Sequence, residues 1–73
     1  MVDEQDIIGP GFVPGVLSRY MGRWQLTHGF HWGALWKSPD GRTWAYVHAP
    51  DARRLASKLV AAEAELWKRG LRP

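Results

Sequence analysis

The chain carries one strong turn signal, the tetrapeptide Ser38-Pro39-Asp40-Gly41. Proline presets a φ of about −65° and glycine readily adopts a positive φ, and a tight turn uses both conformations. Segments 31–37 and 43–48 lie on either side of the turn and alternate large apolar residues with small or polar ones, as β-strands do. The sequence therefore predicts a β-hairpin around this turn.

Pairing across the turn decides which side chains of the hairpin share a face. If Ser38 pairs with Arg42, the large rings fall on one face, with Trp36 opposite Trp44, Ala34 opposite Tyr46 and Trp32 opposite His48. The other face then holds smaller side chains, namely Gly33, Leu35, Ala45, Val47, Lys37 and Thr43. This pairing predicts an aromatic face and a small-residue face.

Segment 23–28 is expected to form a preceding strand, and the length of the turn after it sets its register. A two-residue turn at Gly29-Phe30 suits a type II′ hairpin and places Trp24 and Leu26 on the small-residue face. The rings then form a platform that is either available to a ligand or covered by the short N-terminal helix. A three-residue turn places Trp24 and Leu26 with the tryptophans and makes the aromatic face the core. We favour the second register, because a 73-residue chain without cysteine needs its largest apolar set buried.

Helices are predicted on both sides of the three strands. Pro14 can begin a short helix that stops at Gly22, and segment 50–69 repeats alanine and leucine at helical spacing before Gly70. Residues 1–11 are acidic and contain Gly9-Pro10-Gly11, so we expect an arm followed by a single domain over residues 12–73. The predicted fold class is α+β, with a short N-terminal helix, a three-stranded antiparallel meander and a C-terminal amphipathic helix on one sheet face.

Charge is distributed unevenly along the chain. The formal net charge is +3, but Asp3, Glu4 and Asp6 are all in the first six residues, and residues 7–73 hold ten Lys or Arg against four Asp or Glu, a net charge of +6. A basic body of this kind attracts polyanions moderately, although an ordinary solvated surface explains the same charges. The basic residues expected to contact nucleic acid are Lys37, Arg42, Arg53, Arg54, Lys58, Lys68 and Arg69. Aromatic contacts are expected at the rim of the sheet, from Trp32, Trp44 and His48.

Other functional classes find little support in the sequence. The histidines His28, His31 and His48 are not accompanied by a cysteine or carboxylate that would complete a familiar metal-ligand set, and no nucleophile or phosphate-loop motif is present. We therefore expect no enzyme, no metal and no cofactor. No apolar run is long enough to span a bilayer and the start of the chain is acidic, which predicts no membrane association and a cytoplasmic location.

The segment from His31 to Leu66, with its Trp-x-Ala-x-Trp strand, its SPDGRT hairpin and its alanine- and leucine-rich helix, resembles two groups of proteins. One is the set of short uncharacterised actinobacterial proteins with a strand–strand–strand–helix layout. The other is the arm-binding N-terminal domain of tyrosine recombinases, a resemblance that implies a sheet placed in the DNA major groove. Those sheets present several basic side chains, whereas the strand interiors here carry Trp and Tyr.

Two functions are therefore expected from the sequence. The first is a small non-enzymatic module that binds nucleic acid through a basic helix and the hairpin rim. The alternative is a protein-interaction or homodimerisation module that uses the aromatic sheet face or the apolar residues of the N-terminal arm, Ile7, Ile8 and Phe12.

Overall fold

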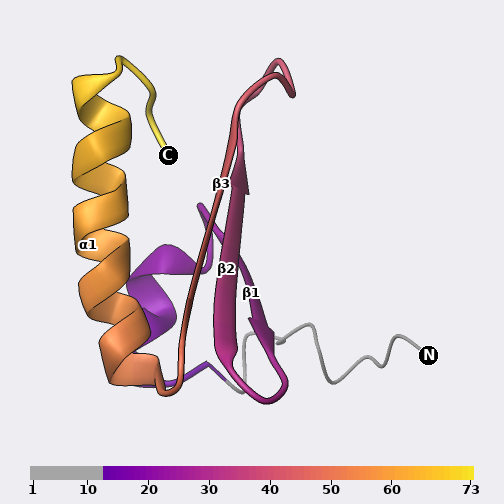
Figure 1. The fold of residues 1–73 in the computed structure, drawn as a ribbon, viewed down its shortest axis with the longest axis vertical. Helices are drawn as coiled ribbons and strands as arrows, with labels where there is room; N and C mark the ends of the chain where they lie inside the picture. The colour runs from indigo at the N-terminus through magenta and orange to yellow at the C-terminus, as the bar shows by residue number, and fades with distance from the viewer. Residues whose placement is uncertain (1–12) are drawn as a thin grey trace.

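The computed structural model describes residues 13–73, which form one sheet and two helical elements (Figure 1). The order of elements is η3 (Gly15–Tyr20), β1 (Gln25–His28), β2 (Trp32–Lys37), β3 (Trp44–Ala49) and α1 (Ala52–Lys68). The three-stranded antiparallel meander and the C-terminal helix of the predicted α+β fold are confirmed. The predicted arm over residues 1–11 lies outside the described residues.

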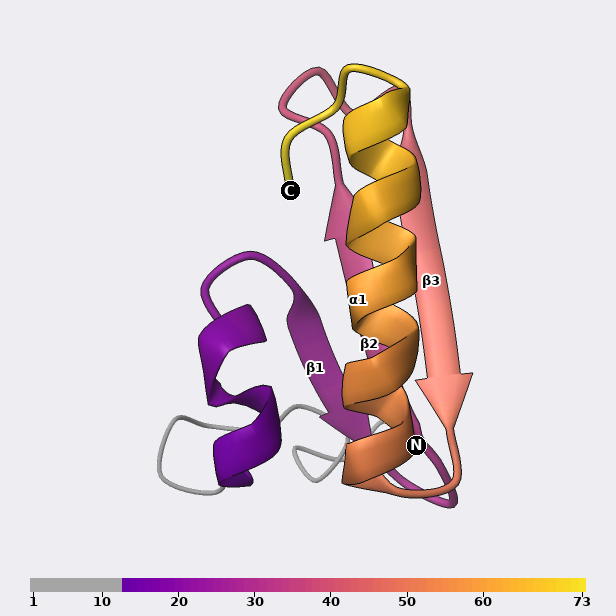
Figure 2. The same cartoon turned by 90° about the vertical axis from the view of Figure 1, so that its left-hand side faces the viewer.

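The sheet has the strand order β1-β2-β3, and the helical elements cover only one of its faces. Figure 2 shows η3 beside α1 on that face, with α1 running along β2 and β3. The buried apolar side chains lie between these layers: Leu17, Tyr20, Trp24, Leu26, Ala34, Trp36, Ala49, Leu55, Leu59 and Leu66. We call this the core face, and the opposite side, which no element of residues 13–73 covers, the outer face.

The turn between β1 and β2 has the three-residue length that was favoured from the sequence. His28 pairs with Trp32 and Leu26 pairs with Ala34, so residues 29–31 form the connection. Trp24 and Leu26 consequently lie on the same face as Trp36, and all three are buried. The preference for the register that buries the larger apolar set is confirmed here.

The predicted pairing of the second hairpin is wrong by one residue. Ser38 donates its backbone N–H to the carbonyl of Thr43 at 2.8 Å, and Trp36 therefore pairs with Ala45 rather than with Trp44. The loop is one residue longer than expected because polar side chains hold it open. The hydroxyl of Ser38 accepts from the backbone N–H of Thr43 and donates to Asp40, whose carboxylate also accepts from the backbone N–H of Arg42.

The register shift divides the rings of the hairpin between the two faces. Trp32, Ala34 and Trp36 share the core face with Ala45, Val47 and Ala49, because side chains alternate along a strand. Trp44, Tyr46 and His48 project from the outer face. The single aromatic face expected from the sequence therefore does not exist, and the expected pairs of Ala34 with Tyr46 and Trp32 with His48 are replaced by Ala34 with Val47 and Trp32 with Ala49.

The element between Pro14 and Met21 is shorter and tighter than the predicted helix. It is a 3-10 helix of six residues that buries Leu17 and Tyr20. Its N-cap residue, Pro14, makes no side-chain capping hydrogen bond. Pieces of 3-10 helix are short and depend on packing, which these two side chains supply.

The C-terminal helix is closely predicted by its sequence pattern. Asp51 caps its N-terminus by accepting from the backbone N–H of Arg54 at 2.8 Å, and Gly70 follows its end with φ of 80°. Its buried stripe contains Leu55, Leu59 and Leu66. The period of about 3.6 residues places these leucines on one side of the helix, facing the sheet.

A carboxylate on α1 ties the helix to the segment before β1. Trp24 is only 2% exposed, and its indole Nε1 donates to Oε2 of Glu63 at 2.8 Å. Arg23 donates to the two oxygens of the same carboxylate at 3.0 and 3.2 Å, and its guanidinium lies 5.4 Å from the centre of the Tyr20 ring. Glu63 thus satisfies a buried donor and pairs with a cation in one contact.

Candidate nucleic-acid interface

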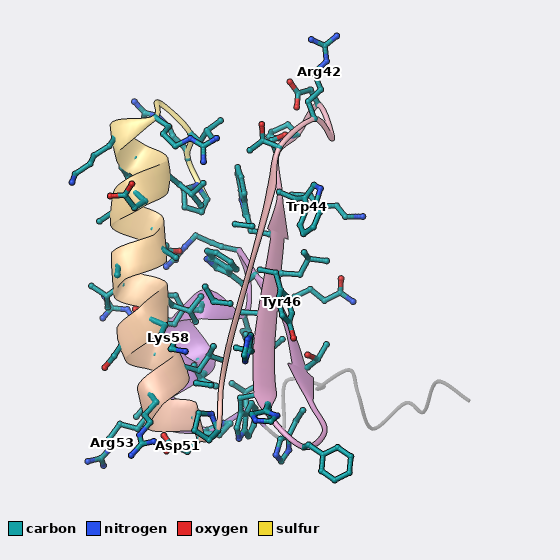
Figure 3. The ribbon with its side chains drawn as sticks, viewed as in Figure 1. Arg42, Trp44, Tyr46, Asp51, Arg53 and Lys58 are labelled. Atoms are coloured by element: carbon teal, nitrogen blue, oxygen red, sulfur yellow. The ribbon has the colours of Figure 1, made fainter. Side chains whose placement is uncertain are left out.

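The outer face of the sheet presents a row of exposed rings on β3. Trp44 is 64% exposed and Tyr46 is 53% exposed, although both belong to a strand whose alternate residues enter the core. Leu35 lies opposite Tyr46 and Lys37 lies opposite Trp44 on β2. Figure 3 shows Trp44 and Tyr46 projecting from the side of the sheet that α1 does not cover.

Tyr46 lies against the sheet because Gly33 has no side chain to occupy that space. A Cβ added to Gly33 would lie 2.7 Å from the Tyr46 hydroxyl and 3.2 Å from its Cε1, and 2.7 Å from Oγ1 of Thr27. The tyrosine therefore crosses the position of the missing side chain on β2. His48 stacks on Tyr46 with ring centres 5.9 Å apart, and this extends the aromatic row along β3.

The hairpin tip brings positive charge next to Trp44. Leu35, Lys37, Gly41 and Trp44 line an open hollow of about 470 Å³, and Arg42 projects from the end of the loop (Figure 3). Asp40 is also at the tip, where hydrogen bonds from Ser38 and from the Arg42 backbone hold the pKa of its carboxyl below the ordinary value. The tip thus carries one cation, Lys37, beside the Trp44 ring and a second, Arg42, farther out at the end of the loop, with an acidic group already engaged in the loop.

Helix α1, which carries the predicted cations Arg53, Arg54, Lys58 and Lys68, lies on the opposite side of the sheet from Trp44 and Tyr46 (Figure 3). Lys58 donates to the backbone carbonyl of His48 at 2.8 Å, Arg54 lies 3.5 Å from Asp51, and Lys68 lies 3.5 Å from Glu65. Arg53 lines a groove of about 420 Å³ between η3 and α1, together with Arg19 and Tyr20. The structure therefore separates the predicted basic site into two surfaces, one on the hairpin and one on the helix.

The predicted aromatic contacts are separated in the same way. Trp44 and His48 lie on the outer face, whereas Trp32 lies on the core face, half-buried, with its ring stacked on His28 at 4.1 Å. Tyr46 and Leu35 were not among the predicted site residues, yet both are central to the exposed face. The sequence already placed Tyr46 on the same face as Trp44 by alternation along β3, but Leu35 joins them only through the observed register.

Among the described residues, the histidines contact aromatic rings and one another rather than a set of other metal-ligating side chains. His31 and His48 meet edge to face with ring centres 5.9 Å apart, and His28 is engaged with Trp32. Within residues 13–73, no group of three or more His, Cys, Asp or Glu side chains is arranged to hold a metal ion. The same residues contain no helix long and apolar enough to cross a membrane.

Comparisons of the chain with family models, with curated proteins and with solved structures gave no significant match.

Proposed function

We propose that this protein is a small non-enzymatic module that binds single-stranded nucleic acid on the outer face of its sheet. The observation that carries the proposal is the exposure of Trp44 and Tyr46 on the outer face, with Lys37 beside Trp44 and Arg42 at the end of the adjoining loop. Exposed rings on a strand offer stacking platforms for bases, each worth about 1 to 3 kcal/mol. Lysine and arginine at the edge of such a platform attract the phosphates.

The distribution of cations supports the sheet rather than the helix as the contact surface. Three of the five predicted helix cations already make contacts within the molecule, from Lys58 to a backbone carbonyl and from Arg54 and Lys68 to carboxylates. Lys37 and Arg42 have no carboxylate within ion-pair distance among residues 13–73. They are therefore available to phosphates without losing a partner.

The chemistry of the outer face supports single strands over duplex. Reading a duplex in the major groove depends on side chains that donate to or accept from base edges, and the recombinase arm-binding domains present basic groups there. The strand interiors here present a tryptophan and a tyrosine, whose flat faces suit bases that are already unstacked. The resemblance to those domains therefore extends to layout and not to the proposed mode of binding.

Fluorescence anisotropy with a labelled single-stranded oligonucleotide of mixed sequence, in DNA and RNA forms, tests the proposal. We expect Trp44→Ala and Tyr46→Ala each to weaken binding by about 5- to 150-fold, the equivalent of one lost stacking contact. Trp67→Ala is the matched control, because Trp67 is a 54% exposed tryptophan on α1, away from the outer face. Absence of binding at low salt, or equal affinities for the three variants, would contradict the proposal.

Two charge variants decide which basic surface is used. Lys37→Ala with Arg42→Ala, and Arg53→Ala with Arg69→Ala, each remove two positive charges from the same chain. The first pair should weaken binding and flatten its salt dependence more than the second. A larger loss from the helix pair would move the contact to α1, and affinity that does not change with salt would favour an apolar protein partner on the same rings.

A further inference from the structure

Within residues 13–73, no further strand pairs with the outer edge of β3. Figure 2 shows β3 at the margin of the sheet with no element beyond it. Ser38 bonds to Thr43, so in the alternating antiparallel pattern the backbone groups of residues 43, 45, 47 and 49 point toward β2. Those of Trp44, Tyr46 and His48 point outward.

Only one of these outward groups has a partner within the described residues. Lys58 donates to the carbonyl of His48 at 2.8 Å, which closes the end of the edge nearest the start of α1. The N–H and C=O groups of Trp44 and Tyr46 have no bond to another part of residues 13–73. Four backbone groups therefore remain open for a further strand.

The edge also lacks the features that usually prevent strand addition. Exposed edges are commonly protected by proline, by a charged side chain, by a bulge or by very short length. The six residues of β3, WAYVHA, contain no proline, glycine, lysine or acidic residue and pair regularly with β2. The other edge of the sheet, β1, is only four residues long.

The geometry points to a second copy of this chain as the occupant, joined edge to edge through β3. In an antiparallel pair with its twofold axis at Ala45, Trp44 lies opposite the partner's Tyr46 and Tyr46 lies opposite the partner's Trp44. This register uses all four open backbone groups in each chain and leaves the carbonyl of His48 with Lys58. It also sets aromatic rings opposite each other across the new strand pair, which is a favourable cross-strand contact.

The residues of α1 on the side nearest the β3 edge are compatible with a twofold axis at Ala45. Lys58 reaches His48, and Ala61 and Glu65 follow it on the same side of the helix at i+3 and i+7. From Ala49 to Ala45 the strand rises about 13 Å, which corresponds to about nine helix residues. Counted from Ala52, at the end of the short connection after β3, that places Ala61 beside the axis.

The residues of α1 near the twofold axis allow the helices of the two copies to lie close together. Ala61 is small, so the two copies of α1 can approach to a normal packing distance of about 8 to 10 Å. The helices run antiparallel, so Glu65 faces the partner's Lys58 and the charges are complementary. The dimer is a continuous six-stranded sheet with α1 and η3 of both copies on one side and the exposed rings of both on the other.

Molar mass measured by light scattering or sedimentation over the micromolar to millimolar range tests the dimer. The wild type should shift from 8.3 kDa toward twice that mass as concentration rises. Tyr46→Pro removes an outward N–H that the monomer does not use and should remain monomeric, whereas Tyr46→Thr keeps that N–H and should still dimerise. A wild type that stays monomeric, or a proline variant that associates as the wild type does, would overturn the inference.

Amide hydrogen exchange on the wild type provides a test that does not depend on how the proline variant folds. The amides of Trp44 and Tyr46 should gain protection as concentration rises, and that of His48 should not, because this register leaves it unpaired. Rapid exchange at Trp44 and Tyr46 at every concentration would exclude pairing through this edge. Protection at His48 as well would contradict the register centred on Ala45.

Discussion

At the residue scale, the most connected side chain of the described chain is Glu63. Its carboxylate accepts from the buried indole of Trp24 and from the guanidinium of Arg23, both close to the start of β1. Trp24 is too deeply buried to reach water in place of this partner. A tryptophan can therefore serve as core here only because a helix residue 39 positions away supplies the acceptor.

We expect Glu63→Ala to lower the free energy of unfolding by about 2 to 3 kcal/mol, because it leaves a buried donor unpaired and removes charge-assisted bonds. Glu63→Gln keeps an oxygen for Trp24 and should cost less. Urea denaturation followed by tryptophan fluorescence measures both. Glu65→Ala is the control at concentrations where the chain is monomeric, since Glu65 is exposed and pairs only with Lys68 among residues 13–73, and its effect should stay within about 0.5 kcal/mol. Equal losses for Glu63→Ala and Glu65→Ala would contradict this account.

At the scale of elements, the second hairpin has the largest effect on the molecule. Its loop contains Gly41 at φ of 74°, and the turn closes with the N–H of Gly41 donating to the carbonyl of Ser38 at 2.9 Å. The loop sets the register of β3, and the register determines that Trp36 is buried while Trp44 is exposed. A local turn thus decides which rings are available to a ligand.

Gly41→Ala should lower the free energy of unfolding by roughly 1 to 2 kcal/mol, because a Cβ is strained at this φ. Gly41→Asn should cost less, since asparagine tolerates the left-handed region better. The control is Gly22→Ala, where an added Cβ meets nothing within 4 Å and φ is not in that region. Thermal unfolding compares the three variants, and similar melting temperatures for Gly41→Ala and Gly22→Ala would show that the turn tolerates a side chain.

At the scale of the whole molecule, the acidic and basic residues are concentrated in different parts of the chain. The acidic residues Asp3, Glu4 and Asp6 precede a body with a net charge of +6. Because these charges belong to the same chain, they are present at a high local concentration near any basic contact surface. They should therefore compete with phosphates for Lys37 and Arg42.

Deleting residues 1–6 should raise the affinity for single-stranded oligonucleotide severalfold at low salt, with a smaller gain as salt increases. Anisotropy titrations at two salt concentrations measure the change. The full-length variant Asp3→Asn, Glu4→Gln, Asp6→Asn should reproduce the gain if charge is the cause. A deletion that raises affinity without a matching effect of the neutral variant would instead implicate the length of the segment, and no change in either would refute the competition.

Some features of this protein could be predicted from its sequence and others could not. The three strands, the turn between β1 and β2 and the helix from Ala52 to Lys68 follow from local patterns and from the need to bury the larger apolar set. The residues of the candidate site were harder to predict, because Lys37 and Lys58 look alike as surface cations in a sequence. Only the structure shows that Lys58 is bonded to a strand carbonyl on one side of the sheet while Lys37 stands beside Trp44 on the other.

By itself, the sequence determined where the chain turns and which segments become strand or helix, because proline, glycine and the spacing of apolar residues act on the backbone nearby. The observed register of the second hairpin decided which rings of β3 face the core, and the packing of α1 decided which face of the sheet is covered. Asp40 and Ser38 bond across the loop and lengthen it by one residue, and a shift of one residue moves every side chain of β3 to the opposite face. Helix α1 then covers one face, and Trp44 and Tyr46 lie exposed on the other.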